Sequence, residues 1–354
     1  MQADMTAIRP RSRKSIMDIA VYVPGTGTVN AAGKIYKLSS GETPPGPCAA
    51  VTEAYRQAAG KPEFYSDGEA FGLRPAISET CYLVSDNIMI GNGSDELQGL
   101  LAQTCLAPED EGIMTEHGFS VCEIQMRATG ATPAIVKGKN CRVGVDTVLA
   151  VPGPPTRIVF IANPGTCLSV EEIYRLHAAL PENVLLVLDG AYAGYISADD
   201  YKAGIELVAT SKNMMVTRTF SKICGLAGLR IGWMYALLHI IDAVNRARGP
   251  FNVNSAAQVA GAAAIRERQF SEKFIAFNAE WCTWLMHELT SIGFRVMLSV
   301  TGFLLVHFPV DEKNPLFWLM IISRPGNIFY AVSAAMDSLM PCVFPLICRK
   351  PTGK

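Results

Sequence analysis

The sequence predicts an α/β protein with a mostly parallel central sheet, helices flanking that sheet, and a second, smaller α+β domain. Short apolar runs alternate with segments of helical periodicity, which is the pattern of an α/β layer. One of these runs, Ile88–Ile90, enters the glycine turn Gly91–Gly93 directly before a helical segment. The chain has 354 residues, enough for two domains and a large buried core.

The elements follow one another in a regular order. Continuous short apolar runs are typical of strands that are buried on both faces of a parallel sheet. In chain order we expect a strand at Ile88–Ile90, a helix at Asp95–Leu106, a strand at Ile158–Ala162, a helix at Val170–Leu180, and strands at Val184–Leu188 and Met214–Thr217. Residues 51–250 are predicted to form the large domain. Residues 1–50 are predicted to form an N-terminal arm and part of the small domain. Residues 251–354 are predicted to form the C-terminal small domain.

Composition narrows the function classes. The 31 basic and 32 acidic residues nearly balance, so nothing indicates a nucleic-acid or membrane surface. A hydrophobic content of 49% with 18% charged residues predicts extensive burial, including a subunit interface. The ten cysteines show no C-x-x-C pair and no His/Cys zinc spacing, so we expect reduced thiols and no metal site. Residues 1–14 lack a signal-like apolar stretch, and a cytoplasmic enzyme is predicted.

The most informative stretch is residues 217–232. Lys222 follows Ser221 directly, and Arg230 comes eight residues later across a segment rich in glycine and alanine. This layout is expected when a lysine forms a Schiff base with an aldehyde cofactor while a serine and an arginine hold the cofactor's phosphate. Taken alone, Arg230 is more typical of a surface or ion-pair arginine.

The turn at Gly91–Gly93 is a second candidate site. Ser94 and Asp95 begin the helix that follows it, where free backbone N–H groups and the helix dipole favour an anion. An ordinary helix cap, with glycines serving the turn, is the alternative.

Asp189 and Tyr192 follow a strongly apolar strand. A carboxylate there is buried, which is unfavourable without a cationic partner. A protonated pyridine nitrogen is such a partner, and a ring kept protonated acts as an electron sink. The alternatives are a helix cap for Asp189 and simple packing for Tyr192.

These motifs together resemble the histidinol-phosphate aminotransferase family, over about Ile16 to Pro309. Further stretches that carry the resemblance are Lys37–Ser40, Glu116–Phe119, Arg248–Val253 and Phe303–Pro309. The resemblance implies fold type I of the pyridoxal-phosphate enzymes, pyridoxal 5'-phosphate as the cofactor, and a homodimer. It also implies transamination between L-histidinol phosphate and 2-oxoglutarate, in L-histidine biosynthesis.

The same resemblance implies a set of catalytic roles. Lys222 would bind the cofactor and then act as the base that moves the substrate proton. Asp189 would pair with the pyridine nitrogen, and Tyr192 would contact the phenolic oxygen. Phe119 would stack on the ring, and Tyr22 would lie near the substrate.

The cofactor's phosphate is implied to have contacts from two subunits. Ser94, Asp95, Ser221 and Arg230 would form its cradle within one chain. Tyr65 would reach the phosphate in the neighbouring subunit.

Several positions depart from the family pattern. The stretch Ala162–Thr166 is about four residues shorter than the family's loop, and we expect Asn163 to fill the role of the asparagine that contacts the phenolic oxygen. Gly41 and Gly302 stand where asparagines are usual, and Gly194 stands where an acidic residue is common. Each replacement removes a hydrogen-bonding side chain and adds backbone freedom.

The tail departs furthest. Past about Val310 the family continues toward an arginine that clamps the substrate's carboxylate or phosphate, whereas here an apolar end follows, and Arg349 is not expected to replace that arginine. We hypothesise a frameshift between Val310 and Arg324. Two alternatives therefore stay open: an aromatic-amino-acid aminotransferase on the same fold, and a catalytically impaired chain that binds the cofactor without turnover.

Overall fold

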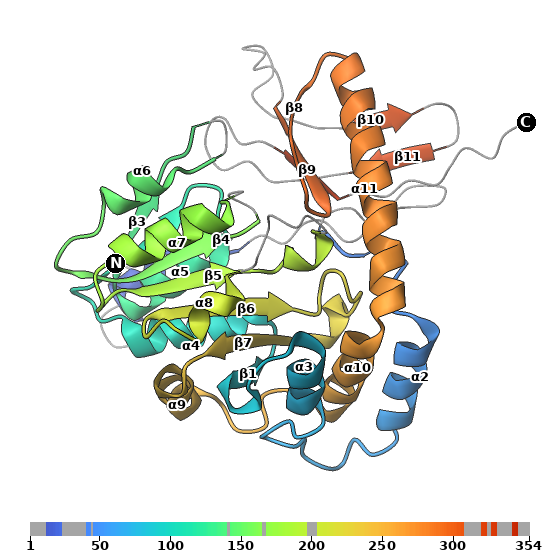
Figure 1. The fold of residues 1–354 in the computed structure, drawn as a ribbon, viewed down its shortest axis with the longest axis horizontal. Helices are drawn as coiled ribbons and strands as arrows, with labels where there is room; N and C mark the ends of the chain where they lie inside the picture. Colours follow the sequence, from blue (N-terminus) through green and yellow to red (C-terminus); the bar gives the residue numbers. More distant parts are fainter. Residues whose placement is uncertain are drawn as a thin grey trace, which may run out of the picture.

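The structure is a computed structural model that describes residues 12–22, 40–43, 45–139, 142–164, 168–196, 204–307, 320–323, 327–330 and 342–345. A large sheet with helices on both faces forms most of it, and the long helix α11 runs from this body to a smaller sheet (Figure 1). The predicted α/β architecture is confirmed.

The large sheet has seven strands in the spatial order β1-β7-β6-β5-β4-β2-β3. The strands are β1 (Ile88–Gly91), β2 (Glu111–Thr115), β3 (Thr132–Val136), β4 (Thr156–Ala162), β5 (Leu185–Asp189), β6 (Met214–Thr219) and β7 (Gly232–Ala236). Strand β7 is antiparallel to both of its neighbours, β1 and β6, and the remaining pairings are parallel. The sheet is therefore mostly parallel, as predicted, with β5 as its central strand.

Both faces of this sheet are buried, which explains the continuous apolar runs. In β5, Leu185 and Val187 point into one hydrophobic cluster, and Leu186 and Leu188 point into the other. Successive side chains of a strand alternate between faces. Asp189 therefore shares its face with Leu185 and Val187.

The helices of the large body are α1 (Lys14–Met17), α2 (Ala49–Ala58), α3 (Leu73–Cys81), α4 (Ser94–Cys105), α5 (Ser120–Thr129), α6 (Val145–Leu149), α7 (Val170–Ala179), α8 (Ile205–Val208), α9 (Leu238–Ala247) and α10 (Ser255–Arg266). Among these helices, α4 to α8 lie in the connections between strands, α1 to α3 precede β1, and α9 and α10 follow β7. The predicted helices near 95–106 and 170–180 correspond to α4 and α7. Ser169 begins α7 with a reciprocal capping box to Glu172, the pattern that stops a helix from fraying at its start.

Beyond residue 251 the chain first stays on the large body and then leaves it. Helix α10 packs against α2 and α3, whereas α11 (Arg268–Ser291) contacts the small sheet. That sheet has the order β12-β9-β8, with β8 (Arg295–Met297), β9 (Phe303–His307) and β12 (Cys342–Pro345), and β10 (Met320–Ser323) pairs with β11 (Asn327–Tyr330). Of the tail that departs from the family pattern, only β10, β11 and β12 are described, and Arg349 lies outside the described residues.

Glycines allow β1, β7 and the start of α4 to approach closely. Gly93, directly before α4, has φ +90°, and a Cβ there would lie 2.5 Å from Nη2 of Arg230. A Cβ on Gly232, the first residue of β7, would lie 2.5 Å from the backbone nitrogen of Ser94. The start of α4 is thus formed by backbone atoms in contact with a neighbouring strand.

We expect Gly93→Ala to destabilise the protein by more than about 1 kcal/mol, because alanine is strained at positive φ and its Cβ collides with the Arg230 guanidinium. Gly228→Ala is the matched control, since a Cβ there meets nothing within 4 Å. Urea unfolding of both variants measures the difference. Equal midpoints for the two variants would show that the turn is not constrained as described.

Candidate active site

Asp189 lies at the carboxyl end of β5, the central strand of the sheet, and is 7% exposed. Three donors hold its carboxylate. Thr217 Oγ1 and the Ala191 backbone N–H donate to Oδ1 at 3.2 and 3.1 Å, and Nε2 of Gln98 donates to Oδ2 at 3.0 Å. Burial raises the pKa of Asp189, while these hydrogen bonds and the nearby Lys222 oppose that rise.

Lys222 follows β6, the strand next to β5. Its Nζ donates to the backbone carbonyls of Ser40 at 3.1 Å and Gly41 at 3.5 Å, and it lies 5.2 Å from the centroid of the Tyr192 ring. Desolvation lowers the pKa of Lys222, although the carboxylates of Glu42 and Asp189 oppose the change. A lowered pKa increases the share of neutral amine, which is the nucleophilic form.

The segment 40–43 crosses directly over Lys222. Thr43 Oγ1 donates to the Lys222 backbone carbonyl and lies 3.4 Å from the Tyr195 hydroxyl. Gly41 has φ +64°, and a Cβ there would lie 3.2 Å from Lys222 Nζ and 3.3 Å from the Tyr192 hydroxyl. A side chain at this position would be crowded by Lys222 Nζ and the Tyr192 hydroxyl, which would have to shift by a few tenths of an ångström.

The other two glycine replacements also lie in close contacts. A Cβ on Gly302 would lie 3.1 Å from the Tyr195 ring, and a Cβ on Gly194 would lie 2.9 Å from Cγ2 of Ile223, the neighbour of Lys222. In this chain, the space of the missing side chains is taken by Tyr195 and Ile223.

Tyr192 closes one side of the cluster. Its ring meets the Phe303 ring edge to face, with centroids 4.9 Å apart, so strand β9 of the small sheet contributes to the site. Burial, with the nearby Asp189 carboxylate, raises the pKa of Tyr192 far above its ordinary value. The hydroxyl therefore keeps its proton and can donate it in a hydrogen bond.

Ser94, Asp95, Ser221 and Arg230 are brought together as predicted. Arg230 donates to the Asp95 carboxylate at 2.8 Å and to the Ser221 hydroxyl at 3.3 Å. Ser94 is the first residue of α4, whose initial N–H groups have no partner within the helix. Arg230 has a left-handed backbone with φ +51°, a conformation that is uncommon outside glycine and occurs at functional sites.

This second cluster fits a phosphate group. It combines two hydroxyls, a guanidinium and the positive end of a 12-residue helix. The Gly93 turn leaves no room for a side chain beside Arg230, so the space at the helix start is bounded by backbone donors. The Asp95 carboxylate would repel a phosphate, and in the structure it accepts from Arg230.

The remaining predicted site residues lie in different settings. Phe119 is the partly exposed residue directly before α5. Tyr22 is 54% exposed, and its electrostatic interaction with Lys222 is one of the smaller influences on the pKa of that lysine. Asn163 donates its backbone N–H to the Asp189 carbonyl at 3.0 Å, and its side-chain amide bonds both backbone groups of Leu168. Its side chain therefore fastens its own shortened loop.

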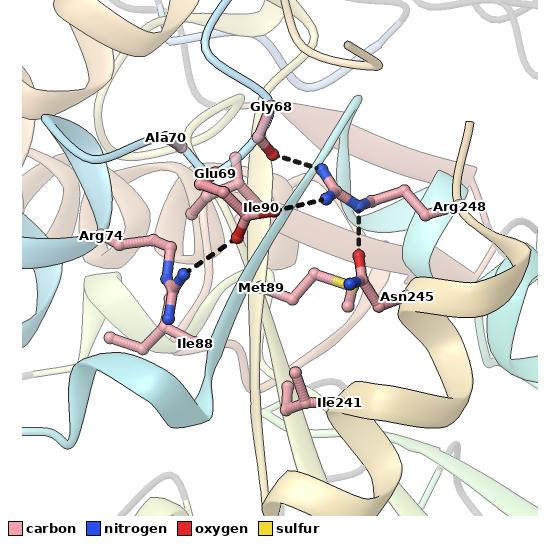
Figure 2. A pocket seen from close by; sticks show the side chains of 10 residues that line it. All are labelled: Gly68, Glu69, Ala70, Arg74, Ile88, Met89, Ile90, Ile241, Asn245 and Arg248. Atoms are coloured by element: carbon pink, nitrogen blue, oxygen red, sulfur yellow. Dashed lines mark hydrogen bonds and ion pairs between the residues drawn. The ribbon is translucent and has the colours of Figure 1, made fainter. Parts of the chain in front are cut away.

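Tyr65 stands apart from these clusters. It is 83% exposed and stacks on Phe251 with ring centroids 4.7 Å apart. Figure 2 shows a cavity next to the segment that follows Tyr65. There Arg248 donates to the Gly68 carbonyl at 2.8 Å, and Glu69 pairs with both Arg248 and Arg74. These arginines fix the chain after Tyr65, so its exposed ring is held outward.

Several residues of the site were not predicted. Gln98 and Thr217 hold Asp189. Thr43 donates to the Lys222 backbone carbonyl, and Tyr195 contacts Thr43. Gln98 had a detectable signal, because it is the polar residue in the apolar run Leu97–Leu101 of a buried helix. The others gave no signal along the chain.

Among the described residues, no helix is long and apolar enough to span a membrane, and no group of three or more metal-binding side chains occurs.

Known proteins are similar to this chain in sequence and in fold. Residues 33–334 match the model of the family described as aminotransferase class I and II. Histidinol-phosphate aminotransferases of Rhodopseudomonas palustris and Nitrobacter winogradskyi are 48% and 47% identical over 309 and 306 residues. The alignments cover 86% and 85% of this chain, and 85% and 84% of the relatives.

A solved structure of histidinol-phosphate aminotransferase from Sinorhizobium meliloti, in complex with pyridoxal-5'-phosphate, has a TM-score of 0.79 and 25% identity. It covers 92% of this chain and 94% of its own. An aspartate aminotransferase from Thermus thermophilus, 18% identical with a TM-score of 0.68, shows the same fold over 75% of each chain. The chain therefore belongs to the class I and II aminotransferase family.

Proposed function

We propose that the protein is a pyridoxal-phosphate-dependent aminotransferase that interconverts L-histidinol phosphate and 2-oxoglutarate with imidazole-acetol phosphate and L-glutamate. The observation that carries the proposal is the pairing of a desolvated lysine amine, Lys222, with a buried carboxylate, Asp189, beside a phosphate cradle. The names of relatives 47–48% identical over most of the chain support the substrate pair and a place in histidine biosynthesis.

Pyridoxal phosphate, when bound, supplies an aldehyde that a lysine amine can capture and a ring that withdraws electrons from the substrate carbon. Lys222 is suited to that capture because desolvation lowers the pKa of its amine. As a free amine, the same Nζ would take a proton from the substrate and return it, which is general base and acid catalysis. The carbonyls of Ser40 and Gly41 keep Nζ oriented.

Asp189 supplies the negative charge that a protonated ring nitrogen needs in a buried setting. Its donors from Gln98, Ala191 and Thr217 favour the ionised form. Tyr192 keeps its proton and can donate to the phenolic oxygen of the cofactor. Phe119 is proposed to support the ring face, and Asn163 is proposed to donate to the same oxygen, since its side-chain amide has two N–H groups and gives one to the Leu168 carbonyl.

Ser94, Ser221, Arg230 and the backbone N–H of Asp95 form the phosphate cradle in this proposal. Positive charge from Arg230 and from the start of α4 favours the dianion. Tyr22, exposed near Lys222, is placed on the substrate side.

We also propose a homodimer in which Tyr65 reaches the partner's phosphate cradle. In support, Tyr65 is exposed, stacked on Phe251 and followed by a segment that Arg248 and Gln258 anchor through backbone carbonyls. A cytoplasmic location is proposed as well; the described cysteines are free thiols, which fits a reducing compartment.

Replacing Lys222 with alanine is expected to lower the transamination rate by about 100-fold or more, because both amine capture and proton transfer are lost. Lys222→Arg keeps the charge but should be equally inactive. The exposed Lys212→Ala is the control and should match wild type. Glutamate formation from histidinol phosphate and 2-oxoglutarate is measured, against aromatic amino acids as competing donors. An inactive wild-type chain that still binds the cofactor would contradict the proposed function.

Mixing inactive chains tests the dimer. Tyr65→Ala chains keep Lys222, and Lys222→Ala chains keep Tyr65, so a mixed dimer rebuilds one complete site. With random exchange we expect about a quarter of wild-type activity at limiting cofactor, since about half of the dimers are mixed and one of two sites works. If native mass spectrometry shows mixed dimers and activity does not recover, Tyr65 does not act across the interface.

A further inference from the structure

Two buried side chains, Gln98 and Cys122, form a hydrogen-bond network that ends at Asp189. Gln98 Nε2 donates to Asp189 Oδ2 at 3.0 Å, and the Cys122 thiol donates to Gln98 Oε1 at 3.3 Å. Gln98 is fully buried, and Cys122 is 3% exposed. A buried amide that lacked either partner would carry a substantial desolvation penalty.

The chemistry of the three groups determines which of them donates and which accepts each hydrogen bond. An ionised carboxylate only accepts hydrogen bonds, so the amide NH2 of Gln98 has to face Asp189. Its carbonyl oxygen is then directed at Cys122, which has to donate. Burial, with the nearby Asp189 charge, raises the pKa of Cys122 well above its ordinary value, so the thiol keeps the proton that it donates.

This hydrogen-bond network also connects Asp189 with helix α4 and with the start of helix α5. Gln98 lies one helical turn after Ser94 on α4, the helix that begins at the phosphate cradle. Cys122 lies in the first turn of α5, and its backbone N–H donates to the Phe119 carbonyl at 3.0 Å. A displacement of Gln98 would therefore disturb Asp189. Ser94 begins the helix that carries Gln98, and Phe119 directly precedes the helix that carries Cys122.

We propose that Gln98, oriented by Cys122, is a positioning residue that fixes Oδ2 of Asp189 and keeps this carboxylate ionised toward a cationic ring nitrogen. Gln98 provides the hydrogen bond to Oδ2, whereas Thr217 and Ala191 act on Oδ1. The part that concerns the ring nitrogen rests on the proposed function. The part that concerns the ionisation of Asp189 holds for the cofactor-free protein.

Other charges around Asp189 act in parallel and have to be kept constant in any test. The Lys222 ammonium on the β6–β7 loop favours the ionised carboxylate. The Tyr192 hydroxyl and the Cys122 thiol face it as neutral groups, because burial raises the pKa of each. Substitution at Gln98 leaves all three groups in place.

The first test follows the protonation of Asp189 in the cofactor-free protein. Infrared difference spectra against pH show the protonated carboxyl band, which Asp189→Asn identifies by removing it. In Gln98→Leu, the loss of one donor should move the midpoint of this band to higher pH. The same midpoint in Gln98→Leu and wild type would overturn the proposal.

Cys122 provides a matched pair of variants. Cys122→Ser keeps a donor to Gln98 and should titrate like wild type, whereas Cys122→Ala removes it and should move the Asp189 midpoint in the same direction as Gln98→Leu. Thermal melting confirms that each variant is folded. If Gln98→Leu does not fold, the Cys122 pair decides the question, and equal midpoints for serine and alanine would overturn the proposal.

The second test uses added pyridoxal phosphate. Gln98→Leu should weaken cofactor binding roughly tenfold, the equivalent of one charge-assisted hydrogen bond, and should shift the pH dependence of the bound cofactor's absorption. Wild-type binding and absorption in this variant would overturn the positioning role. Failure of the wild type to bind the cofactor would count against the proposed function alone, because the cofactor-free titration still tests Gln98.

Discussion

The site depends on a carboxylate buried at the carboxyl end of the central strand. Asp189 is the last residue of β5, and the β4 and β6 residues beside it, Ala162 and Thr217, are in register with it. A buried carboxylate needs donors and a cation to remain ionised. Three donors come from the sheet, the following turn and helix α4, and Lys222 supplies a nearby positive charge. An ionised Asp189 therefore depends on Lys222, on the central sheet and on α4 at the same time.

The reversed strand β7 places the second half of the site. After Lys222 the chain turns and returns antiparallel between β6 and β1, so Arg230 arrives beside the start of α4. The close approach depends on Gly93 and Gly232, which leave space only for backbone. Arg230, which is 135 residues away from Asp95 in sequence, therefore meets the start of α4. The small sheet adds Phe303 against Tyr192, so both sheets contribute side chains to the site.

Local pattern was sufficient for β1, β4, β5 and β6 and for α4 and α7, because each rests on an apolar run or a helical periodicity. It also singled out Lys222, Asp189 and Arg230 as candidates, whose roles stay predictions. It was insufficient where a contact joins distant segments. Gln98 and Asp189 are 91 residues apart, and Thr43 and Lys222 are 179 apart. From sequence, Gly41 is a lost hydrogen-bonding side chain, and the structure adds that this position is crowded by Lys222 and Tyr192. The role of Asn163 stays a prediction, since its amide bonds Leu168.

Reductive trapping measures the central claim, that the desolvated amine beside Asp189 captures the aldehyde. The protein is incubated with pyridoxal phosphate, reduced with borohydride, digested and mapped by mass spectrometry. The account predicts one dominant adduct on the peptide that contains Lys222, formed at a pH below the ordinary pKa of a lysine because burial lowers the pKa of this amine. Adducts spread over exposed lysines, with Lys222 unmodified, would contradict it.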